Sequence, residues 1–183
     1  MRFISLFFVY IVFNNNLLAQ KQPLPATPEK YPQPPFADNR LFFIQRSPNI
    51  DIVVYDANLA SDKTLNAKNP VHPYWIRYAD GGKKSELTAI QRTLAYGVTC
   101  HAIVGEAGSY EMNVVSYKKR KFKITLDAKG VPIALFPING KLAILHHVFV
   151  KIDQEGLLPK IPWVNLYGKD PKTGADVFEQ FKP

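Results

Sequence analysis

The clearest pattern in the sequence is a series of short apolar runs, separated by turn residues, between positions 98 and 153. The last two runs, 131–138 and 141–153, flank the dipeptide Asn139-Gly140. An Asn-Gly pair between runs rich in β-branched residues is typical of a two-residue hairpin, because both central residues of a type I′ turn need a positive φ. The pattern therefore predicts that these two runs are paired antiparallel strands.

The earlier runs of this stretch are joined just as tightly. Turns containing Gly at 105–108 and 127–130 each separate two apolar runs, and the basic residues 118–120 form a corner that leads into the run beginning at Phe122. None of these connections is long enough for a crossover helix, which parallel neighbours in a sheet require. We therefore predict an antiparallel meander through 98–153 and exclude parallel pairing.

Similar apolar runs extend the β pattern toward both ends of the chain. They predict further strands at 41–46, 51–56, 71–78, 163–167 and 176–181. Pro73 cannot donate a hydrogen bond to a neighbouring strand, so its end of the third strand is expected at a sheet edge or a bulge. About ten short strands at even spacing indicate a mainly β protein, built as an antiparallel sandwich or barrel.

One segment departs from the β pattern. Leu87, Ile90 and Leu94 are spaced as on one face of a helix, Ser85 is a suitable N-cap, and Gly97 is placed to follow the C-cap. We therefore predict one amphipathic α-helix over 86–96, packed on a face or at an end of the sheet.

The N-terminal residues predict export. Arg2 precedes the apolar run 3–13, and Ala19 offers a cleavage point, so residues 1–19 have the form of a secretory signal peptide. The run is too short to cross a bilayer comfortably, so we expect no transmembrane segment in the mature chain and a periplasmic or extracellular location. Residues 20–39 contain six prolines and predict an extended linker or arm. Residues 40–183 are then expected to form a single β-rich domain.

The chain carries a formal net charge of +8. Such a balance favours contact with anionic surfaces, although export makes nucleic acid an improbable partner. The candidates for contact with an anionic envelope polymer are Lys118, Lys119, Arg120 and Lys121. The alternative is that this run is a solvated turn whose charges protect a strand edge from pairing.

Several short segments together resemble a known family. They are LFFIQRS at 41–47, YWIRY at 74–78, Gln91-Arg92 followed by Ala95-Tyr96-Gly97, and LYGKD at 166–170 followed by Thr173-Gly174. The combination resembles an uncharacterised family of exported bacterial proteins, domain-of-unknown-function family 4833, over about Pro35 to Phe181. The resemblance implies a single exported domain of the same fold and supplies no catalytic residues.

Two histidines draw attention as candidate ligand-binding or catalytic groups. Neighbouring residues on a strand point to opposite faces, so His146 is expected to face the core and His147 the other side. His146 can then line a cavity as a base or ligand, together with His101 or Glu106. The alternative is a core histidine hydrogen-bonded to a backbone or tyrosine partner.

Trp75 and Arg77 form the second candidate site. They lie two residues apart on one face of the predicted strand 71–78, and a Trp beside an Arg can form a cation–π platform for a ligand. The alternative is core packing, with Arg77 held by an internal carboxylate such as Asp56.

Motifs for metal binding or catalysis are missing from the sequence. It has no paired Cys, no HExxH, no GxSxG and no Gly-rich phosphate loop, and its one cysteine, Cys100, is expected to be a buried small hydrophobe. We therefore expect no metal, no cofactor and no intramolecular disulfide.

Three functions remain open. The first is a noncatalytic binding module of the cell envelope, holding a small ligand or an envelope partner on a concave face. The second is an envelope hydrolase that uses His101, Glu106, His146 or tyrosines near Arg77. The third is a structural component of an envelope assembly, joined through the arm or an open sheet edge.

Overall fold

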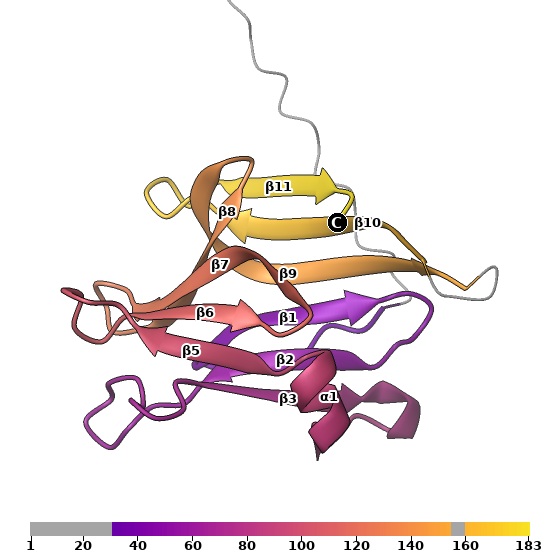
Figure 1. The fold of residues 1–183 in the computed structure, drawn as a ribbon, viewed down its shortest axis with the longest axis horizontal. Coiled ribbons are helices and arrows are strands. Elements are labelled where there is room, and N and C mark those ends of the chain that lie inside the picture. Colours follow the sequence, from indigo (N-terminus) through magenta and orange to yellow (C-terminus); the bar gives the residue numbers. More distant parts are fainter. Residues whose placement is uncertain (1–30, 155–159) are drawn as a thin grey trace, which may run out of the picture.

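A computed structural model describes residues 31–154 and 160–183, so the expected signal peptide at 1–19 lies outside the described residues. The described chain is mainly β, with strands in one curled sheet that forms a half-barrel (Figure 1). The strands are β1 (Arg40–Arg46), β2 (Ile52–Ala57), β3 (Val71–Arg77), β4 (Lys83–Glu86), β5 (Val98–Ala102), β6 (Tyr110–Val114), β7 (Tyr117–Leu126), β8 (Pro132–Ile138), β9 (Lys141–Asp153), β10 (Lys160–Lys169) and β11 (Asp176–Phe181). A short helix α1 (Ala89–Leu94) and a 3-10 turn η1 (Tyr78–Asp80) complete the fold.

The predicted meander is confirmed in part, because residues 98–153 pair antiparallel with one another but belong to a mixed sheet. Strands β5 to β9 pair in chain order, and every neighbour is antiparallel. Asn139 and Gly140 have φ values of +49° and +74°, as a type I′ turn requires, and they bring Ile138 opposite Lys141.

The exclusion of parallel pairing is wrong outside this stretch. β1 lies parallel to β9, with Phe43 opposite His147 and Arg46 opposite Val150. The argument from short connections holds only for strands that are neighbours in the chain, and β1 and β9 are separated by most of the domain. The sheet is therefore mixed, and not purely antiparallel.

β9 is the strand at which the sheet divides. β10 pairs along one of its edges from Ile144 to Asp153. β8 occupies the other edge as far as Ile144, and β1 occupies that same edge from His147 onward. Two wings therefore diverge from β9: a first wing of β1 to β4 and a second wing of β5 to β8. Strands β5 to β7 lie in front of the first wing in Figure 1.

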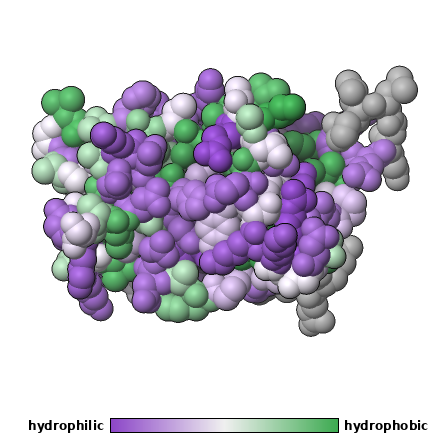
Figure 2. All heavy atoms as spheres, turned by 90° about the horizontal axis from the view of Figure 1, so that it is seen from below, coloured by the Kyte–Doolittle hydropathy of each residue, from purple (hydrophilic) through white to green (hydrophobic). Residues whose placement is uncertain are grey.

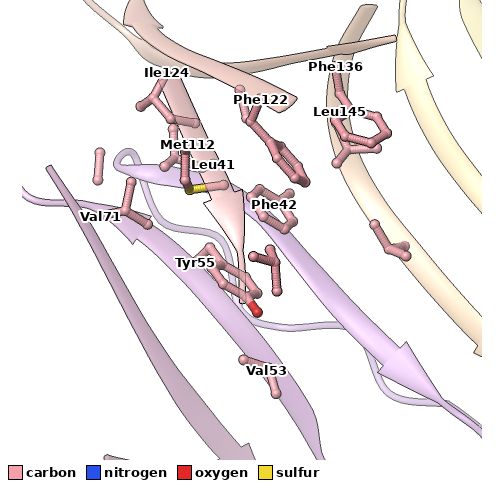
Figure 3. Packing of buried hydrophobic residues seen from close by; sticks show 14 of the residues in the cluster. Leu41, Phe42, Val53, Tyr55, Val71, Met112, Phe122, Ile124, Phe136 and Leu145 are labelled. Carbon is pink, nitrogen blue, oxygen red and sulfur yellow. The ribbon is translucent and has the colours of Figure 1, made fainter. Parts of the chain in front are cut away.

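Aromatic side chains from both wings meet in the main core. Phe42 of β1 stacks on Tyr55 of β2 at a centroid distance of 4.4 Å and on Phe122 of β7 at 5.1 Å. Met112 and Ile124 of the second wing are fully buried beside them (Figure 3). Burial of each such side chain stabilises the fold by about 1.5–3 kcal/mol, so these contacts hold the wings together.

The predicted helix is shorter than expected and begins later. Thr88 is the N-cap, and its side chain and that of Gln91 form a reciprocal capping box. Ser85 and Glu86 instead belong to β4, an edge strand that the helical spacing concealed. Leu87 is buried, but Ile90 and Leu94 are 72% and 70% exposed, so α1 does not bury the apolar face that the periodicity predicted.

The basic run is not at a corner. The turn between β6 and β7 falls at Val115 and Ser116, and β7 begins at Tyr117. The residues from Lys118 to Lys123 therefore lie along a strand, whose alternation turns Phe122 into the core.

The end of the proline-rich segment lies against the domain. Tyr31 is buried and packs edge-on against Phe149 at 5.0 Å, and the side-chain amide of Gln45 donates a hydrogen bond to the carbonyl of Pro32. Phe36 remains 90% exposed. Residues 31–35 thus cover part of the sheet face that points away from the main core.

Candidate functional site

An apolar pocket of about 340 Å³ opens between the two wings. Its lining includes the buried aromatics Phe122 and Phe136. Further lining residues come from the end of α1, from the β6–β7 turn and the residues beside it, and from β1, β9, β10 and the C-terminal end of the chain at β11. They are Ile44, Arg46, Leu94, Ala95, Tyr96, Val114, Ser116, Tyr117, Val148, Val150, Ile152, Ile161, Val164, Leu166, Phe181 and Pro183. The volume falls at the lower end of the range typical of small-molecule sites.

Strand alternation directs these side chains into the pocket. On β1, Phe42 enters the core and Ile44 and Arg46 follow on the same face. On β9 and β10, Val148 lies opposite Leu166 and Val150 opposite Val164, so the two strands form one continuous apolar wall. The wall is therefore a product of the sheet register.

The rim of the pocket is also apolar. Leu94 at the end of α1 is 70% exposed, and Ile161 on β10 is 43% exposed. Contact between large apolar side chains and water is unfavourable, so a ligand that covers these side chains gains binding free energy. The face on the side of β3 and α1 is by contrast largely hydrophilic, with separate hydrophobic patches (Figure 2).

Arg46 is the one charged side chain among the described lining residues. Its guanidinium carbon lies 5.0 Å from the Trp75 ring centroid and 5.5 Å from that of Tyr96. Its Nε atom is buried without a hydrogen-bond partner, and no described carboxylate lies within 4.0 Å of its side chain. The two rings stabilise the cation by cation–π contact, while its buried Nε–H has no acceptor in the described chain.

Trp75 and Arg77 are placed differently from the predicted platform. Trp75 is only 1% exposed, and its indole N–H donates to Oε1 of Gln91 at 3.1 Å. Arg77 lies 5.0 Å from the same ring but pairs with Asp51 at 3.5 Å, not with Asp56. The Trp75 ring therefore contacts the Arg46 guanidinium without lining the pocket, and Arg77 does not line the pocket either.

His146 does not face the core as expected, whereas His147 lies on the other side of the sheet, as expected, and is buried there by aromatic rings. The register between β9 and β10 shifts at this point: Tyr167 lies opposite His147, but Gly168 lies opposite Leu145. The extra residue is a β-bulge, which interrupts the alternation on which the prediction relied. His146 is exposed beside Phe43 and Val131, whereas His147 is buried between the rings of Phe43 and Tyr167.

The residues expected for a hydrolase are not brought together. His101 is exposed on the edge strand β5. Glu106 lies in the turn after β5 and forms an ion pair with Lys123 of β7. No hydrogen bond or ion pair among the described residues joins His101, Glu106 and His146. Cys100 is half-buried against the main core, and burial raises the pKa of its thiol to about 11, which keeps it protonated at neutral pH.

A polar cluster lies on the other side of the first wing. Asp56 accepts hydrogen bonds from Arg40 and from the Tyr74 hydroxyl, the latter at 2.8 Å, and His72 contacts Glu86 at 2.8 Å. Burial, with the neighbouring Asp56 carboxylate, raises the pKa of Tyr74 to about 12. Tyr74 therefore stays protonated at neutral pH, and this cluster lacks a phenolate base.

The four residues of the basic run, 118–121, differ in their exposure and in their ion pairs. Lys118 and Lys119 are exposed, while Lys121 pairs with Glu111 at 2.8 Å. Arg120 forms an ion pair with Glu179, and its guanidinium lies 4.4 Å from the Phe181 ring centroid. Arg120 thus ties β7 to β11 and is not available to an external polymer.

Arg46 is the candidate residue that sequence reasoning missed. A signal was present, because alternation from Phe42 through Ile44 places a charged residue on the core face of its strand. No group of three or more His, Cys, Asp or Glu residues suited to a metal ion is found in the described part of the chain. Within the same residues, no helix is long and apolar enough to cross a membrane.

No curated protein and no solved structure matches this chain. A family model described as a domain of unknown function, DUF4833, matches residues 42–180, nearly the whole described domain. This span includes Arg46 and most of the pocket. The chain therefore belongs to the domain-of-unknown-function family DUF4833.

Proposed function

We propose that this protein is a noncatalytic binding module that holds a small apolar molecule in the pocket between its two wings. The apolar lining of that pocket carries the proposal, since a preformed cavity that opens through the apolar side chains of Leu94 and Ile161 is suited to an apolar guest. Each methylene group transferred from water into such a lining contributes about 0.8 kcal/mol, or roughly a fourfold gain in affinity.

We further propose that the module acts outside the cytoplasm, in the periplasm or beyond the cell. This rests on the charged start, apolar run and small-residue cleavage point within 1–19. N-terminal sequencing of the protein recovered from the producing bacterium tests it. A mature chain that begins at Gln20 supports export, and an intact Met1 in a cytoplasmic fraction contradicts it.

The hydrolase alternative has less support from the geometry. The candidate groups His101, Glu106 and His146 are unconnected, and the thiol of Cys100 is protonated at neutral pH. A structural role in an envelope assembly makes a different prediction: the purified chain would associate with envelope material, and blocking the pocket would leave that association unchanged.

Titration calorimetry with a series of linear alcohols tests the binding function. Affinity should rise about fourfold per methylene group until the pocket is full. Val150 is half-buried and lines the pocket, so Val150→Phe should fill the space and weaken decanol binding at least tenfold. Val104 is fully exposed in the β5–β6 turn, so Val104→Phe is the matched control and should bind as the wild type does. Equal binding by both variants, or no binding by the wild type, would refute the proposal.

A further inference from the structure

We propose that the guest is a single-chain amphiphile with a carboxylate head, a fatty-acid-like molecule whose head is bound by Arg46. This inference rests on the proposed binding function and adds the chemical class of the ligand. Its starting point is the combination of one cation with a lining that is otherwise apolar except for Ser116.

The cation is held in place without being neutralised. The guanidinium of Arg46 is held near the rings of Trp75 and Tyr96, and Trp75 is itself fixed by its hydrogen bond to Gln91 on α1. Buried charged groups in folded proteins are normally paired with an opposite charge, because leaving water costs them their hydration. The buried Nε of Arg46 has no such partner in the described chain, so the site supplies a donor and lacks an acceptor.

The donor geometry selects the head group. A guanidinium presents parallel N–H groups that match the two oxygens of a carboxylate, and the resulting charge-assisted hydrogen bonds are about twice as strong as neutral ones. A neutral alcohol cannot accept in this bidentate manner, and a cationic head is repelled. With one cation among the described lining residues, a head group of single negative charge is the closest match.

The position of Arg46 sets the direction of the chain. Arg46 ends β1 opposite Val150 and is half-buried, whereas Phe122 and Phe136 are buried in the core. The head therefore sits toward the outer part of the pocket, and the alkyl tail extends along Val150 and Val148 toward the buried aromatics.

Calorimetry with decanoate, decanol and decyltrimethylammonium at pH 8 tests the inference on the full mature chain. The wild type should bind decanoate at least tenfold more tightly than decanol and should bind the cation more weakly than either. Equal affinities for decanoate and decanol in the wild type would overturn the carboxylate assignment, and this comparison requires no variant to fold.

Variants assign the effect to Arg46. Arg46→Met should abolish the preference for decanoate over decanol, and Arg46→Lys should retain part of that preference. Arg77→Met is the matched control, since Arg77 lies at the same distance from Trp75 but outside the pocket lining. An unchanged preference in Arg46→Met, or equal losses in both Met variants, would contradict a direct contact.

The two proposals fail in different ways. If decanol binds and Val150→Phe abolishes its binding, but decanoate is not preferred, only the head-group inference is wrong. If neither ligand binds to the wild type, the binding function is wrong as well.

Discussion

The imidazole of His147 lies parallel to the phenol ring of Tyr167, with centroids 4.8 Å apart and an interplanar angle of 11°. The ring of Phe43 stacks on His147 as well, at 4.4 Å. His147 is therefore enclosed by aromatic groups from β1 and β10. Burial, with a further contribution from the charge of His146, lowers the pKa of His147 to about 3.

The first prediction concerns acid stability. Because the folded pKa of His147 lies below the unfolded value of about 6.5, protons bind preferentially to the unfolded chain between these values. This group should therefore reduce the free energy of unfolding by about 1.4 kcal/mol per pH unit as the pH falls below 6.5. His147→Phe should change stability little at pH 7 but should be about 2–3 kcal/mol more stable than wild type near pH 4.5.

Urea unfolding at several pH values measures the difference between wild type and His147→Phe. His101→Phe removes an exposed imidazole from the edge strand β5 and serves as the control, with no comparable gain at low pH. Parallel pH profiles for the wild type and His147→Phe would show that His147 is not a buried neutral group.

Local turn chemistry made the second half of the fold predictable. Asn139 and Gly140 determine their hairpin locally, and the turns at 105–108 and 127–130 likewise use glycines with positive φ. The reversal at Val115 and Ser116 has no such signal, and it was expected at 118–120. The pairing of β1 with β9 depends on contacts between distant segments, which no local pattern encodes. The spacing of Leu87, Ile90 and Leu94 predicts a helix from Glu86 with Ser85 as its N-cap, yet only Leu87 is buried and both Ser85 and Glu86 belong to β4.

The candidate site was less predictable than the fold, because a single bulge changes which side chains face inward. The extra residue at His146 reverses the alternation along β9, so Val148 and Val150 enter the pocket and His147 leaves the core face. The sequence shows no mark of this bulge. Arg46 was detectable as an inward-facing charge, but its lack of a carboxylate partner is visible only in three dimensions.

A second prediction tests the bulge itself. Gly168 lies opposite the bulged segment, and a Cβ atom there would lie 2.7 Å from the carbonyl oxygen of Ile144 and 2.8 Å from Cδ1 of Ile138. Gly168→Ala should therefore destabilise the protein by about 1–3 kcal/mol, measured by urea unfolding. Ile138→Val removes one of the two clashing atoms, so the double variant should lose less stability than the sum of the single changes. Strict additivity would contradict the proposed contact.

A third prediction separates two exposed residues of α1. Leu94 and Ile90 are about equally exposed, but only Leu94 lines the pocket. Leu94→Gln should weaken decanol binding about threefold to tenfold through lost apolar contact, and Ile90→Gln should leave it unchanged. Both variants should unfold within about 0.5 kcal/mol of the wild type. If Leu94→Gln and Ile90→Gln weakened decanol binding equally, the ligand would not be contacting the helix through the pocket lining alone.

The last prediction concerns the ion pair that anchors β11. Glu179 accepts hydrogen bonds from Arg120 and from the backbone N–H of Asn139, the latter at 2.7 Å. Burial raises the pKa of Glu179, but these two hydrogen bonds outweigh burial and hold the pKa below its usual value. The charged carboxylate therefore stabilises the fold above the unfolded pKa of about 4.3, and this contribution is lost as the pH falls through the folded value.

Glu179→Gln should accordingly cost about 1–3 kcal/mol at pH 7, a loss of several degrees in Tm, because Arg120 keeps its charge without a carboxylate partner. Glu111→Gln breaks the more exposed pair with Lys121 and should change stability by no more than about 0.5 kcal/mol. The gap between wild type and Glu179→Gln should close as the pH is lowered below 4, since protonation then removes the same charge from the wild type. A gap that does not narrow at all as the pH falls below the unfolded pKa would mean that the loss comes from packing and not from the charge.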